Sequence, residues 1–163
     1  MTVTVTLPSL SDQINAFSVQ NISQLVEWEY ADNCGLSEEL VKAVVSMYLN
    51  RRGFSVRVGA KGEKGPDIEA ATLDETIVLE AKGEASRPEM FGNFFLAALG
   101  QILLRMTRTE RRYVIALPYH KKFVKMVQHL PGSVRQKLQL EFWLVGKFAD
   151  NCWAIALLLP STQ

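Results

Sequence analysis

The sequence has few of the residues that build zinc sites or disulfide frameworks. Only two cysteines and two histidines occur in 163 residues. Cys34 and Cys152 are isolated, without C-x-x-C spacing, and His120 and His129 lie far from both in the sequence. Structural zinc sites take closely spaced cysteine and histidine ligands. We therefore expect no zinc site, and we expect both cysteines to be reduced packing residues.

Long apolar runs are also missing. No stretch reaches the roughly 18 apolar residues of a membrane-spanning helix, and the apolar segment 154–159 is far too short. Residues 1–6 lack the basic start and the apolar core of a secretory signal peptide. A cytoplasmic protein with no membrane partner is therefore expected.

A strong excess of charge of either sign is absent too. Eighteen Lys and Arg residues face 17 Asp and Glu residues, which gives a net charge of +1. Such a balance does not by itself indicate a nucleic-acid partner, so only local clusters of Lys and Arg would be evidence for one. Neither internal repeats nor a shift in composition marks a second domain. We expect one domain over residues 34–163, preceded by an N-terminal extension, 1–33, that packs on it.

Hydrophobic periodicity predicts an alternation of helices and strands after residue 35. Ser37 is a suitable N-cap for a helix that ends near Gly53. The predicted helices span 37–52, 90–106 and 120–130, with another turn at 133–138; the predicted strands span 54–58, 65–70, 75–82, 112–117, 140–145 and 152–159. In the second helix Leu99, Ile102, Leu103 and Met106 are expected to face the core. In the N-terminal extension, residues 22–30 form a further possible helix.

Asp67, Glu80 and Lys82 are the candidate site residues in the stretch 65–82, which the pattern predicts to be a turn followed by two strands. Pro66 fixes the backbone ahead of Asp67. Glu80 and Lys82 are two residues apart, so on a strand their side chains project from the same face. An antiparallel neighbour would bring Asp67 close to Glu80. The apolar run 77–79 indicates burial on both faces, where unpaired charges cost several kcal/mol.

These residue types suit metal-assisted hydrolysis of a phosphodiester. Such a reaction needs a hard divalent cation on oxygen ligands, an activated water and positive charge near the phosphate. Asp67, Glu80 and the backbone carbonyl of Ala81 would form part of an octahedron around Mg2+, or Mn2+ in its place. Lys82 would orient the attacking water or stabilise the developing charge.

The pattern Pro66-Asp67, twelve residues, then Glu80-Ala81-Lys82 resembles the PD-(D/E)XK signature of the restriction-endonuclease-like nucleases. The resemblance covers about residues 37–117. It implies an α/β (α+β) fold with a three-layer core, in which helices flank a mixed β-sheet in the order αβββαβ, followed here by a C-terminal helix and strands. In that superfamily an N-terminal helix often carries a metal-associated glutamate, here Glu38 or Glu39, of which Glu38 shares a stripe with apolar residues. The helix after the second motif often bears a glutamine, here Gln101.

Ordinary structural roles exist for each of these residues. Glu80 and Lys82 would be an exposed pair on a solvated sheet face, and Asp67 a turn residue after proline. Glu38 and Glu39 both suit a helix N-terminus by charge alone, and Gln101 would be a plain polar helix residue. The loop 59–65 is no phosphate-binding P-loop, because it lacks the G-K-[ST] ending before a helix.

The resemblance implies a Mg2+-dependent DNA endonuclease, with restriction, repair, junction resolution and service to a mobile element all open as roles. Four basic residues border the expected site and would follow a nucleic-acid backbone: Lys61, Lys64, Arg105 and Arg108. A homodimer would suit paired cuts on two strands, with residues 1–33 as an interface. The rival functions are a catalytically inactive nucleic-acid-binding or protein-interaction module of the same fold, and an RNA nuclease.

Overall fold

The chain folds around one mixed sheet of seven strands, in the order β1-β7-β6-β5-β4-β3-β2. The structure is a computed structural model that describes residues 14–19, 35–148 and 152–160. The strands are β1 (Asn15–Val19), β2 (Ser55–Val58), β3 (Ile68–Ala71), β4 (Thr76–Ala81), β5 (Arg112–Pro118), β6 (Leu140–Phe148) and β7 (Cys152–Leu158). The helices are α1 (Glu38–Arg51), α2 (Met90–Arg105), α3 (Lys121–His129) and α4 (Gly132–Leu138). The predicted order of helices and strands after residue 35 is confirmed.

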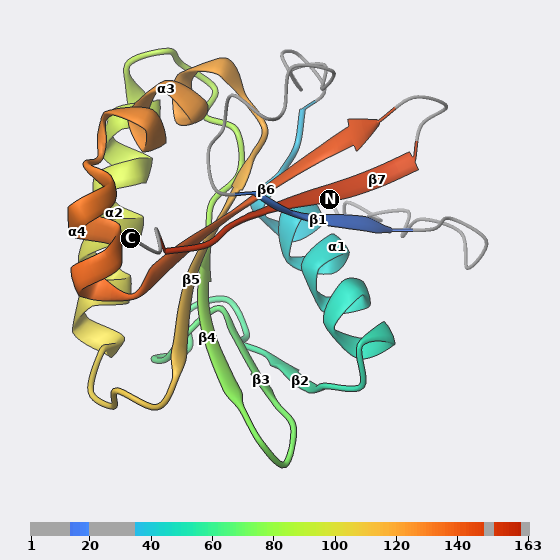
Figure 1. Cartoon of the computed structure of the whole chain (residues 1–163). Helices are drawn as coiled ribbons and strands as arrows, with labels where there is room; N and C mark the ends of the chain where they lie inside the picture. Colours follow the sequence, from blue (N-terminus) through green and yellow to red (C-terminus); the bar gives the residue numbers. More distant parts are fainter. Residues whose placement is uncertain (1–13, 20–34, 149–151, 161–163) are drawn as a thin grey trace.

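The sheet separates two helical layers, as the predicted three-layer architecture requires. Figure 1 shows α1 on one face of the sheet and α2, α3 and α4 on the other. The centre of the sheet is parallel, because β5 pairs in parallel with both β4 and β6. Such parallel strands are covered on both faces and are apolar along their whole length. Accordingly, every residue of β5 from Tyr113 to Pro118 is buried.

The α1 layer begins and ends where the sequence predicts. Ser37 caps the helix, because its Oγ accepts a hydrogen bond from the Leu40 backbone N–H at 3.2 Å. Gly53 follows the helix with φ +88°, a conformation that favours glycine. The buried face of α1 consists of Val41, Val44, Val45 and Leu49, which pack on the sheet.

The predicted core stripe of α2 is partly wrong. Leu103 is 45% exposed, whereas the buried residues are Phe91, Phe95, Ala98 and Ile102. The two aromatic rings decide the rotation of the helix, because Phe91 packs on Phe123 at 4.9 Å between ring centroids and Phe95 on Phe142 at 5.9 Å. These contacts turn the opposite, leucine-bearing side of α2 toward solvent.

Only part of the N-terminal extension can be compared with its prediction. β1 is an edge strand that pairs in parallel with β7. The possible helix 22–30 and Cys34 lie outside the described residues. At the other end, β6 continues three residues further than the predicted strand 140–145, as far as Phe148. Among the described helices, none has the length and apolar character needed to cross a bilayer.

Gly83 lets the end of β4 approach the start of α1 closely. A Cβ at this position would fall on the Glu38 backbone nitrogen and lie 2.7 Å from the Ser37 carbonyl carbon. Since these are backbone atoms, they cannot rotate away. We expect Gly83→Ala to lower the free energy of unfolding by about 1–3 kcal/mol, the usual cost of overpacking, as measured by urea denaturation.

The matched control is Gly100→Ala on α2, where nothing lies within 4 Å of an added Cβ. Alanine in a helix interior is favoured over glycine by roughly 0.5–1 kcal/mol, so this variant should be as stable as the wild type or more stable. Equal stability of both variants would contradict the close approach at Gly83.

Candidate functional site

The register of β3 and β4 brings Asp67 opposite Glu80. Ile68 pairs with Leu79 in the antiparallel ladder, so the next position outward pairs the two acidic residues. Asp67 is held there by its own side chain, because Oδ2 accepts a hydrogen bond from the Ala81 backbone N–H at 2.7 Å. The proximity that the sequence predicted for these two carboxylates is therefore the observed one.

Glu80 is buried, with 2% of its side chain exposed. It lies on the same strand face as Val78, which belongs to the core under α2. Its Oε1 accepts a hydrogen bond from Arg105 Nε at 3.2 Å, and Arg105 Nη2 also donates to the Gly65 carbonyl oxygen at 2.7 Å. Arg105 therefore connects the end of α2, the buried carboxylate and the loop that precedes Asp67.

The environment of Glu80 raises the pKa of its carboxyl group to about 7. Burial is the largest cause, because it penalises the charged form, and the negative charge of Asp67 adds to it. The hydrogen bond from Arg105 opposes both effects. A pair of carboxyl groups that resist joint ionisation is unusual for ordinary surface residues and is common where acid–base or metal chemistry takes place.

Lys82 follows directly after β4. Its backbone N–H donates to the Ala116 carbonyl oxygen at 3.0 Å, which continues the ladder with β5. Its Nζ lies 3.8 Å from Glu38 Oε2, and Lys42 Nζ lies 3.4 Å from Glu38 Oε1. Glu80 and Lys82 therefore take their partners from opposite helical layers, Arg105 of α2 and Glu38 of α1. These contacts differ from the prediction that both side chains project toward one face of the strand; Lys82 lies just past the end of β4, where its ammonium reaches α1.

The structure does not bring every predicted site residue together. Glu38 contacts two lysines, and within the described residues it does not form a metal-binding group of three with Asp67 and Glu80, so its role as a metal ligand stays a prediction. Gln101 is exposed, and Arg105, one turn further along α2, makes the contact with Glu80. Both positions belong to one helical stripe. Gln101 was expected to support the site and Arg105 to contact nucleic acid, so the contact between Arg105 and Glu80 was not predicted. Lys42 as a partner of Glu38 was missed, although its i,i+4 spacing was a usable signal.

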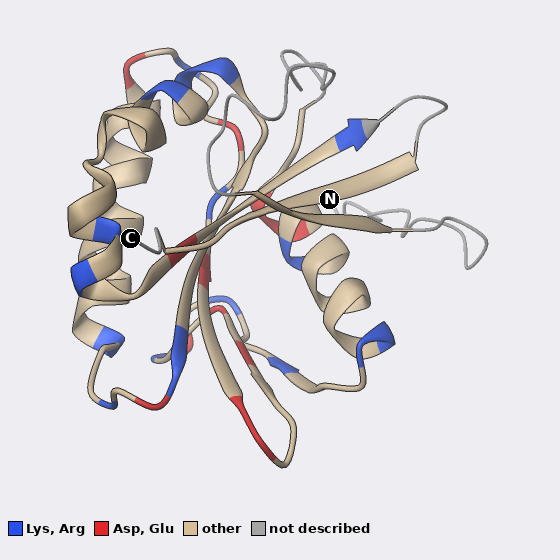
Figure 2. Ribbon diagram, viewed as in Figure 1, with Lys and Arg blue, Asp and Glu red and all other residues tan. Residues whose placement is uncertain are grey.

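The predicted nucleic-acid-contacting residues fall into two places. Lys61 and Lys64 are exposed in the loop between β2 and β3, which Glu63 ties together by accepting hydrogen bonds from Ala60 N–H and Arg57. Arg108 is exposed after α2 and pairs with Glu110 at 3.7 Å. Figure 2 shows Lys and Arg but no Asp or Glu along α2, α3 and α4, whereas α1 carries residues of both signs. The helices of the α2, α3 and α4 layer are therefore locally basic, although the chain as a whole has a net charge of only +1.

The paired carboxylates fit a cation that needs few protein ligands. Within residues 14–19, 35–148 and 152–160, no three His, Cys, Asp or Glu residues are grouped in a way that would hold a metal ion. Asp67 and Glu80 alone supply hard oxygen donors. Mg2+ keeps several waters and is usually bound through one or two carboxylates together with substrate phosphate oxygens. A two-carboxylate site of this kind suits Mg2+ better than a cation that requires a full protein cage.

Comparisons with known proteins give limited similarity. No family model and no curated protein matches the chain. Among solved structures, an XisH family protein from Nostoc punctiforme PCC 73102 has a TM-score of 0.44 and 21% identity, over 64% of this chain and 88% of that one. A FdxN element excision controlling factor protein from Anabaena variabilis has a TM-score of 0.45 and 19% identity, over 66% and 88% of the two chains.

Proposed function

We propose that this protein is a metal-dependent endonuclease that hydrolyses phosphodiester bonds in DNA. The observation that carries the proposal is the Asp67–Glu80 pair, in which a buried carboxyl group with a pKa near 7 faces a second carboxylate. Burying such a pair is costly unless a proton or a cation neutralises it. The resemblance to the PD-(D/E)XK signature supports metal-dependent phosphodiester hydrolysis as the function of this pair.

Asp67 and Glu80 would hold Mg2+, or Mn2+ in its place. When bound, the cation supplies positive charge to the scissile phosphate and makes a water molecule more acidic. Lys82 orients the attacking water and stabilises the negative charge that develops on the phosphate. Glu38 is a positioning residue, because its carboxylate fixes the Lys82 ammonium at the end of β4.

A second candidate is a DNA-binding module of the same fold without catalysis. One contact favours it: the Arg105 guanidinium already neutralises Glu80, so a cation is not needed to stabilise the buried carboxylate. The two functions differ in what happens to Arg105 when a divalent cation is added. In the nuclease Arg105 has to leave Glu80, and it then lies beside the phosphate backbone, whereas in the module it stays in place.

The experiment that separates the two functions is nicking of a supercoiled plasmid. The nuclease converts the plasmid to open circles with Mg2+ and leaves it intact with EDTA. The double variant Asp67→Asn, Glu80→Gln serves as the control for contaminating nuclease, since it keeps both side-chain shapes and removes both charges. A folded wild type that binds the plasmid but never cuts it, with Mg2+ or Mn2+, would leave the binding module as the better function.

Arg105→Ala is expected to strengthen metal binding. A guanidinium hydrogen-bonded to Glu80 competes with a cation for the same carboxylate and repels it, so its removal should raise Mn2+ affinity by on the order of tenfold. The measurement is calorimetric titration at pH 8.5. The high pH is needed because Arg105 lowers the pKa of Glu80, and without it a proton competes more strongly.

Arg108→Ala is the matched control for this titration. Arg108 lies three residues further along the chain, is 62% exposed and contacts Glu110 rather than the site. Its removal should leave Mn2+ affinity within about twofold, as expected for a screened surface charge. Equal Mn2+ affinities of the wild type and both variants would show that Arg105 does not compete with the cation for Glu80.

A further inference from the structure

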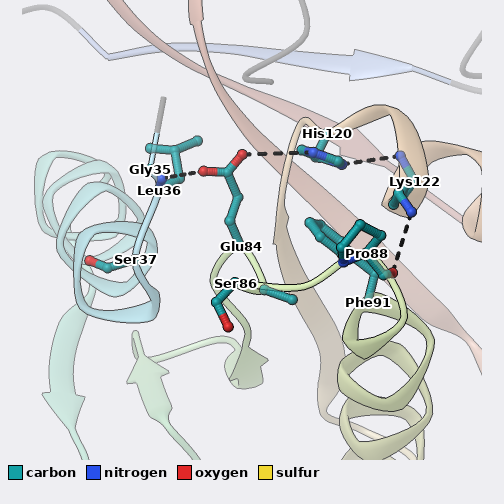
Figure 3. A pocket seen from close by; sticks show the side chains of 10 residues that line it. Gly35, Leu36, Ser37, Glu84, Ser86, Pro88, Phe91, His120 and Lys122 are labelled. Carbon is teal, nitrogen blue, oxygen red and sulfur yellow. Dashed lines mark hydrogen bonds and ion pairs between the residues drawn. The ribbon is translucent and has the colours of Figure 1, made fainter. Parts of the chain in front are cut away.

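A cavity of about 610 Å³ lies beside the proposed site, where α1, α2 and α3 begin. It is found past the carboxyl ends of the adjacent parallel strands β4 and β5, the usual place for ligands in such sheets. Figure 3 shows its lining: Gly35, Leu36, Ser37, Glu84, Ala85, Ser86, Pro88, Phe91, His120 and Lys122. Ser37 adjoins Glu38, and Glu84 is two residues after Lys82. Two residues of the cavity wall are therefore close in sequence to the proposed catalytic Lys82 and to its partner Glu38.

Lys122 provides an uncompensated positive charge at this cavity. Its Nζ donates to the Pro88 carbonyl oxygen at 3.3 Å and lies 5.7 Å from the centroid of the Phe91 ring (Figure 3). Both partners are neutral, and no carboxylate of the described residues pairs with this ammonium. The contacts hold the charge in place without cancelling it. An anion at the cavity therefore meets a positioned cation.

Glu84, the acidic residue of the lining, uses both carboxylate oxygens for contacts with other wall residues. Its Oε2 accepts a hydrogen bond from the Leu36 backbone N–H at 2.6 Å, and its Oε1 lies 3.9 Å from His120 Nε2. Because His120 Nδ1 accepts from the Lys122 backbone N–H at 3.1 Å, a neutral His120 carries its hydrogen on Nε2, toward Glu84. Glu84 thereby joins the starts of α1 and α3. These contacts hold the Glu84 carboxylate against the starts of the two helices, so an anion in the cavity is expected to bind at Lys122 rather than beside Glu84.

The rest of the lining suits the other parts of a nucleotide. Ser86 is exposed, and its hydroxyl makes one weak contact with the Met90 sulfur at 3.9 Å, so it can rotate to donate to a phosphate oxygen. Ala85 and Pro88 add apolar surface for a sugar and a base. Cavities of roughly 300–1,000 Å³ hold small organic ligands, and one of this size cannot accommodate the full width of a duplex.

We propose that this cavity binds one unpaired nucleotide adjacent to the scissile phosphodiester, with its phosphate on Lys122 and Ser86. The proposal rests on the proposed nuclease function and narrows its substrate class. DNA with an unpaired strand next to a duplex, such as a flap, gap or branch, should bind better than continuous duplex.

The test is fluorescence anisotropy in EDTA, where cleavage does not interfere. The probes are a fluorescein-labelled 20-base-pair blunt duplex and the same duplex with a five-nucleotide single-stranded extension. The wild type should prefer the extended DNA by about tenfold, the value of one charge-assisted contact. Lys122→Ala should lose this preference and leave blunt-duplex affinity unchanged, and Lys122→Arg should retain it. For the extended DNA, the slope of log affinity against log salt should fall by about 0.7 in Lys122→Ala.

Lys125→Ala is the matched control, because Lys125 is exposed on the same helix and does not line the cavity. It should affect both DNAs equally and only slightly. A wild type without preference, or a Lys122→Ala effect shared by both DNAs, would overturn the cavity proposal. Since no cleavage is required, a Lys122-dependent preference without Mg2+-dependent nicking would refute the nuclease and keep the cavity. Mg2+-dependent nicking without a preference for the extended DNA would refute the cavity proposal and keep the nuclease.

Discussion

Glu80→Gln is expected to abolish DNA cleavage and, at the same time, to stabilise the metal-free protein at high pH. Loss of a metal ligand should reduce cleavage by at least about a hundredfold, since loss of outer partners of a metal ligand alone often costs 10- to 100-fold. The stability effect arises because Glu80 has a raised pKa of about 7 in the folded protein, against an ordinary value of 4.5. The neutral amide avoids burying a charge beside Asp67 and can still accept from Arg105.

The sign of the pH dependence follows from the two pKa values. Below about pH 4.5 Glu80 is protonated in both folded and unfolded chains, so it does not lower the free energy of unfolding. As the pH rises to about 7 the unfolded chain releases this proton first, and the wild type loses up to about 3 kcal/mol of stability. Glu80→Gln has no such loss. Urea denaturation of both proteins between pH 5 and pH 8 should therefore show the variant gaining relative stability with rising pH, and a pH-independent difference would contradict the raised pKa.

Lys82→Ala is expected to reduce cleavage by about 10²–10⁴-fold while leaving metal affinity nearly unchanged. Lys82 does not hold the cation, so its removal takes away charge stabilisation and water orientation but neither carboxylate. The measurements are single-turnover cleavage of plasmid DNA and calorimetric titration with Mn2+. A variant that cuts as fast as the wild type would exclude Lys82 from the reaction.

Lys42→Ala is the matched control, because Lys42 is the other lysine that contacts Glu38. Each of the two lysine side chains is 15% exposed, so a general loss of charge or packing around Glu38 would affect both variants alike. Cleavage by Lys42→Ala should stay within a few fold of the wild type, the usual range for a partly exposed ion pair. A loss as large as that of Lys82→Ala would mean that Glu38 and its surroundings, rather than Lys82, matter for activity.

The elements after residue 35 were predictable because each has a local signal, whereas the edge strand β1 was not predicted. Ser37 and Gly53 mark the ends of α1, and the alternation around Glu80 predicts a strand with a charged residue on an otherwise apolar face. The closeness of Asp67 to Glu80 also followed from sequence, since a short turn between two strands implies an antiparallel pair. These are interactions between residues that lie near one another along the chain.

The partners of the charged residues were not predictable in the same way. Whether Gln101 or Arg105 reaches Glu80 depends on the rotation of α2, which Phe91 and Phe95 set through rings contributed by α3 and β6. Likewise Glu38 meets Lys82 because Gly83 lets two distant segments approach closely. The cavity at Lys122 arises where three helices begin, far apart in the sequence. Contacts of this kind are decided by tertiary packing, and periodicity does not encode them.

The central claim is that Asp67 and Glu80 together hold a divalent cation. Calorimetric titration with Mn2+ at pH 8, on the wild type and on the Asp67→Asn, Glu80→Gln double variant, tests it most directly. We predict saturable binding of a single cation to the wild type and none to the double variant, with circular dichroism confirming that both are folded. Absence of binding to the folded wild type at millimolar Mn2+, or equal binding to both proteins, would contradict the claim.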